Sequence, residues 1–374
     1  MLLTRARAVA TRSPARTPSP ATRRATGRST GPATTTSRLL HRHQRQRRLL
    51  DRLQDRHRRE GVLDHHLPDG LVRRGRRAPD RDRDPLGQAA ADPASCITDA
   101  TTEETDCGNW GVSATWAVPS GAVSGVYIAH LTRSDNGDDS NITFIVRNDA
   151  SHSDVVFQTS DPTWEAYNTY GGADLYTGGE NGRAYKVSYN RPVTTREDEP
   201  GGQDFFMANE YPAIRFLERN GYDISYMAGV DTDRYGSLIK NHKVFLSVGH
   251  DEYWSGAQRA NVEAARDAGV NLQFLSGNEV YWRTRYESSL DSSHTPYRTL
   301  VTYKEAWSQA KIDPSPESTS TWRDPRYAPQ SEGGGLPENA LTGTIFMANY
   351  IDLPLTVTKA EASLRLWRNT GSRR

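Results

Sequence analysis

The chain has 374 residues, enough for about two domains, and a formal net charge of +1 at pH 7. It contains no run of about 18 apolar residues, so the sequence excludes a membrane-spanning helix. The charge is unevenly divided: residues 1–88 hold 22 Arg and 8 acidic residues, whereas residues 89–374 hold 25 basic and 38 acidic residues.

Residues 1–88 have an unusual composition, because they contain no Ile, Phe, Tyr, Trp, Asn or Lys. Such a segment buries too little apolar surface to offset chain entropy, so we expect it to be disordered. Its excess of Arg, Pro, Ala, Thr and His is what a GC-rich gene yields when read out of frame. The alternative is a basic arm that binds nucleic acid. Such an arm would normally mix Lys with Arg and carry aromatic residues, so we predict no nucleic-acid partner.

Residues 89–150 are predicted to be all-β. Strands are expected at residues 125–131 and 142–146, separated by a turn-rich segment at 134–140. Trp110 and Trp116 can fill a small core. So few strands are typical of part of a β-sandwich.

Cys96 and Cys107 are the only cysteines in the chain. Their spacing, in a segment rich in Ser, Thr, Asp and Gly, suits a small disulfide loop on an exported protein. Two unpaired thiols in a cytosolic chain are the alternative, and four-ligand metal spacing is missing. We therefore expect an extracellular or cell-surface protein of a bacterium, although no signal peptide is visible in this chain.

Residues 151–374 are predicted to form an α/β domain. Helices are expected from a cap at Asn209 to Gly221, and from a capping box of Ser255 and Gln258 to Gly269. Alternating strands and helices predict a parallel, doubly wound sheet, whose ligands bind beyond the carboxyl ends of the strands. Residues 364–368 resemble a strand cut short, so we expect the domain to be truncated there. The strands are expected at residues 154–159, 224–227, 243–249 and 271–276.

Polar side chains follow two of these expected strands. His250 and Glu252 come after one strand, and Asn278 comes after the next. The chain has no nucleophile elbow, no Walker A loop and no Gly-x-Gly-x-x-Gly after a strand. A structural hydrogen bond for His250, and a turn role for Asn278, are the alternatives to a catalytic role.

A cluster of tyrosines follows the first strand of the domain. Tyr167 and Tyr170 lie in residues 164–172, and Tyr185 and Tyr189 lie in residues 184–192. Phenolates and carboxylates are hard oxygen donors that favour ferric iron, and a bound metal acts as a Lewis acid. An aromatic loop that packs or binds substrate is the alternative interpretation.

Residues 154–305 resemble the carboxy-terminal domain of the large (beta) subunit of N,N-dimethylformamidase. The elements Gly-His-x-Glu-Tyr-Trp and Ser-Gly-Asn are fairly specific in combination. The resemblance covers under half of the chain. The stretches that carry it are residues 164–168, 189–192, 249–254, 275–282 and 303–305.

This resemblance implies a fold similar to class I glutamine amidotransferases, a flavodoxin-like parallel sheet, without their catalytic cysteine. It also implies one ferric ion held by two tyrosinates and a glutamate, which hydrolyses an amide C–N bond. The family enzyme has a small partner subunit. The residues carried over are Glu252, Tyr167 and Tyr189 as metal ligands, with Tyr170 as the alternative to Tyr167, and His250 and Asn278 as assisting groups.

The leading prediction is therefore an iron-dependent hydrolase of a small amide, in which an α/β domain follows a partial β-sandwich. The alternative is a non-catalytic exported surface or carbohydrate-binding protein, whose Tyr and Trp side chains stack on sugar rings. The sequence leaves the identity of the substrate and the oligomeric state open.

Overall fold

The computed structural model describes residues 3–8, 94–133, 136–137, 139–194, 205–349, 354, 356–368 and 370. It divides into two compact units. The first comprises residues 1–90, 113–147 and 214–222, and the second comprises residues 91–112, 148–213 and 223–374. Apart from residues 3–8, the segment 1–88 that we expect to be disordered lies outside the described residues.

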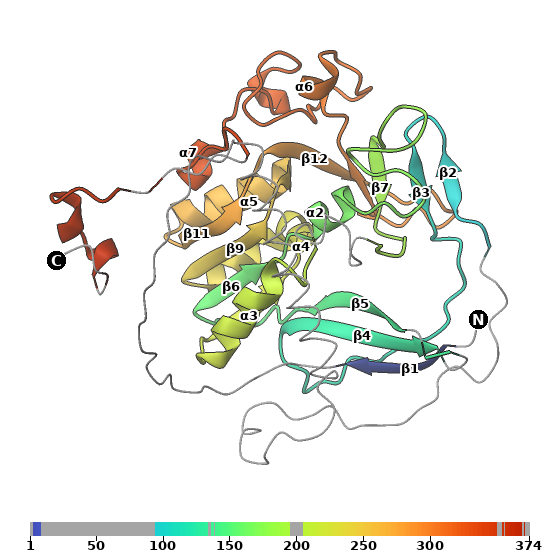
Figure 1. Cartoon of the computed structure of the whole chain (residues 1–374), viewed down its shortest axis with the longest axis horizontal. Coiled ribbons are helices and arrows are strands. Elements are labelled where there is room, and N and C mark those ends of the chain that lie inside the picture. The colour runs from blue at the N-terminus through green and yellow to red at the C-terminus, as the bar shows by residue number, and fades with distance from the viewer. Residues whose placement is uncertain are drawn as a thin grey trace, which may run out of the picture. The chain divides into compact units, whose positions relative to one another are not determined.

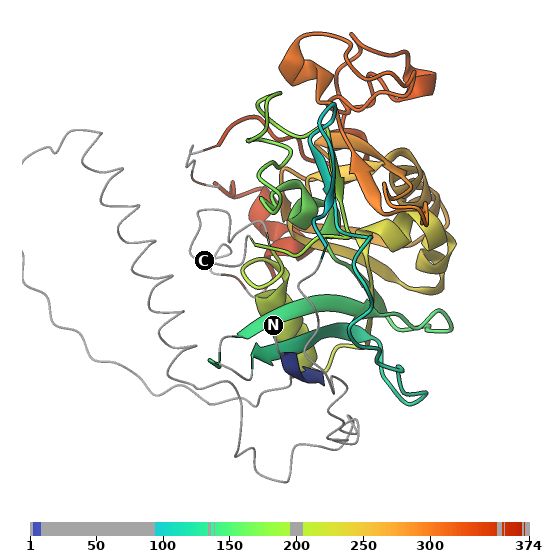
Figure 2. The same cartoon turned by 90° about the vertical axis from the view of Figure 1, so that its right-hand side faces the viewer.

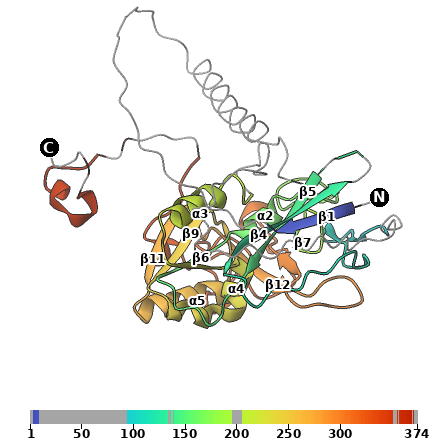
Figure 3. The ribbon, with the colours of Figure 1, turned by 90° about the horizontal axis from the view of Figure 1, so that it is seen from below.

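The first unit holds a three-stranded antiparallel sheet with the order β1-β4-β5 (Figure 3). The rings of Trp116, Tyr127 and Phe144 pack together, with centroids 5.8 to 6.1 Å apart. Trp116 therefore contributes to a small aromatic cluster, while Trp110 belongs to the second unit. The described strands of the first unit form one sheet, and the sandwich stays a prediction. The strands are β1 (Leu3–Ala8), β4 (Gly125–Arg133) and β5 (Asp139–Val146).

The second unit is built on a four-stranded sheet with the order β11-β9-β6-β8, in which all neighbours are parallel (Figure 1). This confirms the α/β sheet expected from alternating strands and helices. β6, β8 and β9 are short, mostly buried runs, as expected for strands covered on both faces, whereas the edge strand β11 alternates exposed and partly buried residues. The strands are β6 (Val155–Gln158), β8 (Ile224–Met227), β9 (Val244–His250) and β11 (Asn271–Gly277).

Helix α5 (Gly256–Asp267) connects β9 to β11 and has the predicted start. Ser255 accepts a hydrogen bond from the backbone N–H of Gln258, and the Gln258 side chain accepts one from the N–H of Ser255. The helix contacts α4 (Gly229–Tyr235) and the 3₁₀ helix η2 (Gly236–Asn241). The core includes Val156, Met227, Ile239, Phe245, Trp254, Val262, Ala265 and Val270.

A second four-stranded sheet has the order β10-β12-β13-β7. Because β10 starts three residues after β9 ends, Asp251 and Glu252 form the link between the two sheets. A second core lies at this sheet and contains Leu175, Val187, Tyr253, Trp282 and Leu300. Its strands are β7 (Lys186–Ser188), β10 (Tyr253–Ser255), β12 (Trp282–Glu287) and β13 (Thr299–Val301).

A disulfide between Cys96 and Cys107 closes the hairpin of β2 (Ile97–Asp99) and β3 (Glu104–Asp106). This confirms the expected pairing of the cysteines. The hairpin lies beside β7 (Figures 1 and 2). The N–H of Cys107 donates to the carbonyl of Asn190 at 3.1 Å, and the N–H of Tyr185 donates to Thr102 at 2.8 Å.

The strand expected at residues 364–368 is wrong, because residues Arg365–Trp367 form the 3₁₀ helix η5. Leu364 and Leu366 are both exposed, so no buried face holds them in a sheet. Among the residues that the structure describes, none of the helices is long and apolar enough to cross a membrane. The other helices are α2 (Asp161–Ala166), α3 (Glu210–Arg219), α6 (Glu305–Ser308), η3 (Gln330–Glu332), α7 (Asn339–Thr342) and η4 (Glu361–Ser363).

Candidate active site

Glu252 lies at the carboxyl end of β9 and is 3 % exposed. The turn needs Gly249, since its φ is +91° and a Cβ there would lie 2.6 Å from Cβ of Asn209. Backbone bonds then fix Glu252 itself. Its N–H donates to the Thr163 hydroxyl at 3.1 Å, and its carbonyl accepts from Trp282 N–H at 2.9 Å. The carboxylate is therefore presented from a rigid link rather than from a loose loop.

The neighbouring carboxyl of Asp251 has different partners from Glu252. Asp251 Oδ2 accepts hydrogen bonds from Gln158 Nε2 and from Ser247 Oγ, each at 2.7 Å. Burial raises the pKa of Asp251 to about 7, although its hydrogen bond from Ser247 opposes the shift. Asp251 thus belongs to the polar interior of the sheet, and Glu252 is the carboxylate of the candidate site.

Two phenols converge on Glu252. The Tyr167 hydroxyl donates to Oε2 at 3.0 Å, and the Tyr176 hydroxyl donates to Oε1 at 2.7 Å. The two rings are stacked, with centroids 4.6 Å apart. Burial and the negative charge of Glu252 raise the pKa of Tyr176 well above its usual range. Burial and the hydrogen bond to Glu252 thus both favour the neutral phenol form of Tyr176.

His250 and Asn278 lie at the same edge of the parallel sheet. His250 Nε2 is 3.4 Å from Glu252 Oε2, and its ring centroid is 5.5 Å from that of Tyr167. Gly277 is the register partner of His250, so Asn278 leaves the sheet next to it, with a φ of 53°. The structure thus brings His250, Glu252 and Tyr167 together and places Asn278 at the adjoining strand end.

Tyr189 is not brought to Glu252. Its hydroxyl donates to Asp161 Oδ2 at 3.0 Å, and its ring packs 6.4 Å from Tyr286. Burial, followed by the charge of Asp161, raises the pKa of Tyr189 well above its usual range. Tyr170 contributes its carbonyl to Arg191 rather than a hydroxyl to the carboxylate. Tyr176, absent from the sequence-based ligand set, takes the second place beside Glu252.

A polar cavity of about 370 Å³ lies near the start of α5, next to Tyr286, whose ring packs against that of Tyr189. Tyr286 lines this cavity together with Asp233, Ser255, Thr284 and Tyr297. Glu252 is not among its lining residues, so the cavity and the carboxylate site are separate features of this unit.

Lys304 is a further residue of the site, which lies in the matching stretch 303–305 but was given no role from the sequence. Its side chain is fully buried, and Nζ lies 3.2 Å from the centroid of the Tyr176 ring and 4.9 Å from that of Trp282. Burial lowers the pKa of Lys304 well below its usual range, although the Glu252 charge opposes this. Within the described ranges Nζ has no hydrogen-bond acceptor, so the amine lies among aromatic rings, with that of Tyr176 nearest.

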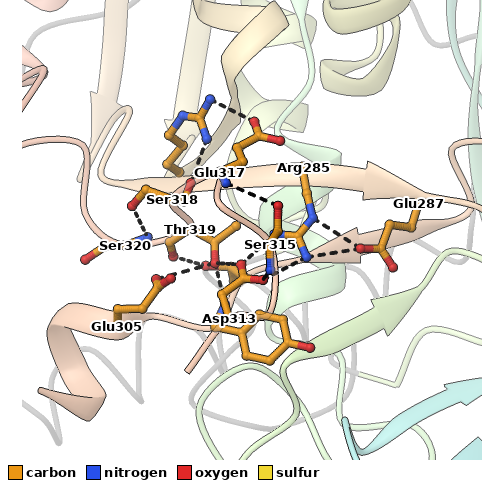
Figure 4. Close-up of polar contacts among 12 residues, drawn as sticks. Arg285, Glu287, Glu305, Asp313, Ser315, Glu317, Ser318, Thr319 and Ser320 are labelled. Carbon is orange, nitrogen blue, oxygen red and sulfur yellow. Dashed lines mark hydrogen bonds and ion pairs between the residues drawn. The ribbon is translucent and has the colours of Figure 1, made fainter. Parts of the chain in front are cut away.

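A polar network fixes the turn that carries Lys304 (Figure 4). Thr319 is its centre: its carbonyl accepts from Lys304 N–H at 3.2 Å, and its hydroxyl donates to Asp313 at 2.7 Å. Asp313 in turn forms a bidentate pair with Arg285. The network explains how Lys304 keeps a left-handed backbone, with a φ of 50°, above Tyr176.

The oxygen donors at Glu252 are phenols and one carboxylate. Within the described part of the chain, no three His, Cys, Asp or Glu side chains group so as to hold a metal. Any metal site here would therefore depend on Tyr167 and Tyr176, whose protons a bound cation would displace.

Comparison with known proteins identifies the family of the chain. A family described as "N,N-dimethylformamidase beta subunit-like, C-terminal" matches residues 73–374, which extends beyond the resemblance at residues 154–305 in both directions. No curated protein matches the chain. Because the match covers most of its length, the chain belongs to the N,N-dimethylformamidase beta subunit-like, C-terminal family.

Proposed function

We propose that this protein is an iron-dependent hydrolase of a small amide. In the reaction, water adds across the amide C–N bond to give a carboxylic acid and an amine. The observation that carries the proposal is the pair of phenol hydroxyls, Tyr167 and Tyr176, on the two oxygens of the buried Glu252 carboxylate. Membership of the dimethylformamidase-like family is consistent with an amide hydrolase.

The donor set fits ferric iron. Tyr167, Tyr176 and Glu252 supply three hard oxygen donors, which suit a hard cation better than zinc or copper(I). Once both phenols lose their protons, the three groups carry three negative charges in a buried place. Burial makes such charges costly unless a cation neutralises them, which favours an ion of high charge. These three residues would hold the metal.

Bound iron would supply a Lewis acid that polarises the amide carbonyl and makes water more acidic. His250 lies 3.4 Å from Glu252 and is placed to accept a proton from a water molecule at the site. Asn278 leaves the adjoining strand end, where its side-chain amide can donate to a substrate carbonyl. Both roles need only the positions that the sheet register provides.

Lys304 would respond to ionisation of Tyr176. Its Nζ sits on the face of the Tyr176 ring, and the ring of a phenolate attracts an ammonium more strongly than that of a phenol. A buried amine that is neutral beside the phenol is therefore favoured in its charged form beside the phenolate. Lys304 can thus take up one proton close to the Tyr176 hydroxyl, which loses one.

We also propose that the sheet has the flavodoxin-like arrangement of class I glutamine amidotransferases. In chain order the strands of the sheet β11-β9-β6-β8 are the fourth, third, first and second, which supports that arrangement. Tyr167 follows the first strand and Glu252 follows the third. These two strands are neighbours where the strand order reverses, the usual place for ligands in such sheets.

The proposal is tested by iron content and visible absorption of the purified chain, beside Glu252→Gln. Near-stoichiometric iron and a tyrosinate-to-iron band in the wild type, both lost in the variant, would support it. Hydrolysis of a small amide, followed by amine release, would then establish the activity. A folded wild-type chain that takes up no iron and stays colourless would sink the proposal.

A further inference from the structure

Arg191 lies in the Tyr-Asn-Arg-Pro element at residues 189–192, yet its side chain reaches the loop that carries the other two tyrosines. The guanidinium is buried and donates four hydrogen bonds to main-chain carbonyls. Three of those carbonyls lie between residues 165 and 173, on both sides of Tyr167 and just before Tyr176.

The guanidinium of Arg191 contacts three segments of the chain. Nη2 donates to the Glu165 carbonyl at 2.8 Å. Nη1 donates to the carbonyls of Tyr170 at 2.9 Å and Ala173 at 3.2 Å. Nε donates to Ser188 at 3.1 Å and lies 3.5 Å from the Glu165 carboxylate. One side chain thus ties the end of α2, the middle of the loop and β7 together.

The middle of the loop holds two glycines, and Arg191 acts there beside main-chain bonds such as Gly172 N–H to the Thr169 carbonyl and Leu175 N–H to the Ala166 carbonyl, each at 3.0 Å. Gly171 and Gly172 have φ values of +94° and +95°, a backbone that gains freedom readily if its partners are lost. At its far end, Asp174 Oδ1 accepts from the N–H groups of Tyr176 at 2.7 Å and Thr177 at 2.6 Å. Side chains therefore hold the main chain of the loop on both sides of the glycine pair, through Arg191 at the Tyr170 and Ala173 carbonyls and through Asp174, two residues before Tyr176.

A guanidinium suits this task because its planar fork offers five N–H donors in fixed directions. Lysine keeps the charge opposite Glu165, but its compact ammonium does not reproduce the fixed fork that reaches several carbonyls at once. Replacing Arg191 by Lys would thus leave buried carbonyls without donors and free the glycine pair. The two phenols would then lose their fixed separation while the rest of the sheet keeps its packing.

We infer that Arg191 is the positioning residue that sets the separation of Tyr167 and Tyr176, so that both phenols reach Glu252 together. The inference rests on the proposed function only where iron serves as the readout. It concerns the geometry of the loop, which can be measured without a bound metal.

The test compares Arg191→Lys with Arg259→Lys in the full chain. Arg259 is a matched control, because it is also buried and donates to main-chain carbonyls, those of Leu336 and Pro337. We expect Arg191→Lys to lower the affinity for iron, measured against a competing chelator, by roughly 10- to 100-fold, as loss of an outer support does at other metal sites. The control should bind iron like the wild type.

A spectroscopic readout separates positioning from general destabilisation. At saturating iron, Arg191→Lys should show a weaker or shifted tyrosinate band per bound iron, because one phenolate no longer binds. Unchanged affinity and an unchanged band in a folded Arg191→Lys variant would overturn the inference. Asp174→Ala, which frees only the Tyr176 end of the loop, is the second variant if Arg191→Lys does not fold, and it should alter the same band.

Hydrogen exchange on the metal-free chain keeps the inference apart from the proposed function. Arg191→Lys should speed exchange at residues 166–177 selectively, whereas Arg259→Lys should not. If the wild type binds no iron, the proposed function fails, and this exchange pattern alone supports the positioning role of Arg191. Equal exchange at residues 166–177 in wild type and Arg191→Lys would overturn it.

Discussion

The hydroxyl of Tyr176 donates to Glu252 Oε1 at 2.7 Å, although 76 residues separate them in the chain. Tyr176 is the partner that the linear pattern of motifs did not single out. Tyr189, in the more conspicuous Tyr-Asn-Arg-Pro element, bonds to Asp161 instead. The identity of the second phenol at the carboxylate is thus a consequence of how the loop after α2 folds back.

This arrangement predicts different outcomes for two matched substitutions, Tyr176→Phe and Tyr189→Phe. Each substitution removes one hydroxyl group and leaves an aromatic ring of similar size. We expect Tyr176→Phe to lower iron content and the visible band strongly, because one of three donors is lost, while Tyr189→Phe keeps both. Metal analysis and absorption spectra of the two variants check this; equal loss in both would contradict the placement of Tyr176.

Lys304→Met should stabilise the fold of the metal-free chain while impairing the site. The wild-type amine is fully buried without an acceptor among the described residues, and removing an unsatisfied buried polar group is worth about 1 to 3 kcal/mol. Urea unfolding of wild type and variant at pH 7 measures the difference. A less stable Lys304→Met chain would show that the amine has an acceptor in solution.

The same substitution should change the dependence of stability on pH. The folded state lowers the pKa of Lys304, so at pH values between the folded and unfolded pKa the unfolded chain binds more protons. The wild type therefore becomes more stable as pH rises through this window towards the ordinary lysine pKa of about 10.4. The advantage of Lys304→Met should shrink accordingly when unfolding is repeated at increasing pH.

For Glu210 we expect the opposite dependence of folding stability on pH. Burial raises its pKa to about 7 from 4.5, and Oε1 accepts hydrogen bonds from Ser160 and Trp164 while Oε2 has no partner among the described residues. The folded state thus binds the proton more tightly, and stability should fall as pH rises from about 4.5 to 7. Glu210→Gln, which resembles the protonated acid, should remove up to about 3 kcal/mol of that fall. An unchanged slope in urea unfolding between pH 5 and 8 would contradict a buried, proton-binding Glu210.

Loss of the disulfide should destabilise the second unit. The double variant Cys96→Ser and Cys107→Ser releases a loop with a sequence separation of 11, which costs about 2 to 3 kcal/mol in the chain-entropy model. The hairpin also holds Asn181, whose N–H donates to Glu103 at 3.0 Å, next to the loop of Tyr176. Denaturant unfolding under oxidising and reducing conditions measures the effect, and only the wild type should respond to the reductant.

Local patterns in the sequence were enough to predict the parallel sheet and the start of α5. Alternating apolar runs and capping residues act over a few neighbouring positions, so Ser255 and Gln258 could be paired from their spacing alone. The carboxyl ends of parallel strands also lie at the same edge of a sheet, which predicted that Glu252, His250 and Asn278 lie at one edge. The strand expected at residues 364–368 failed because alternation alone does not supply a surface to bury it.

Only the tertiary structure decided which side chains meet at that edge. Tyr167, Tyr176 and Tyr189 all follow the first strand of the sheet in the chain, and sequence order does not say which of them reach Glu252. Arg191 and Asp174 determine it for Tyr176, through hydrogen bonds to main-chain groups that no motif records. Lys304 reaches Tyr176 across 128 residues because a network centred on Thr319 fixes its turn. The sequence by itself thus determined the sheet, its polar edge and the carboxylate, since these follow from short-range periodicity. The choice of the second phenol and the buried amine came from long-range packing, whose energies depend on contacts that exist only in the folded chain.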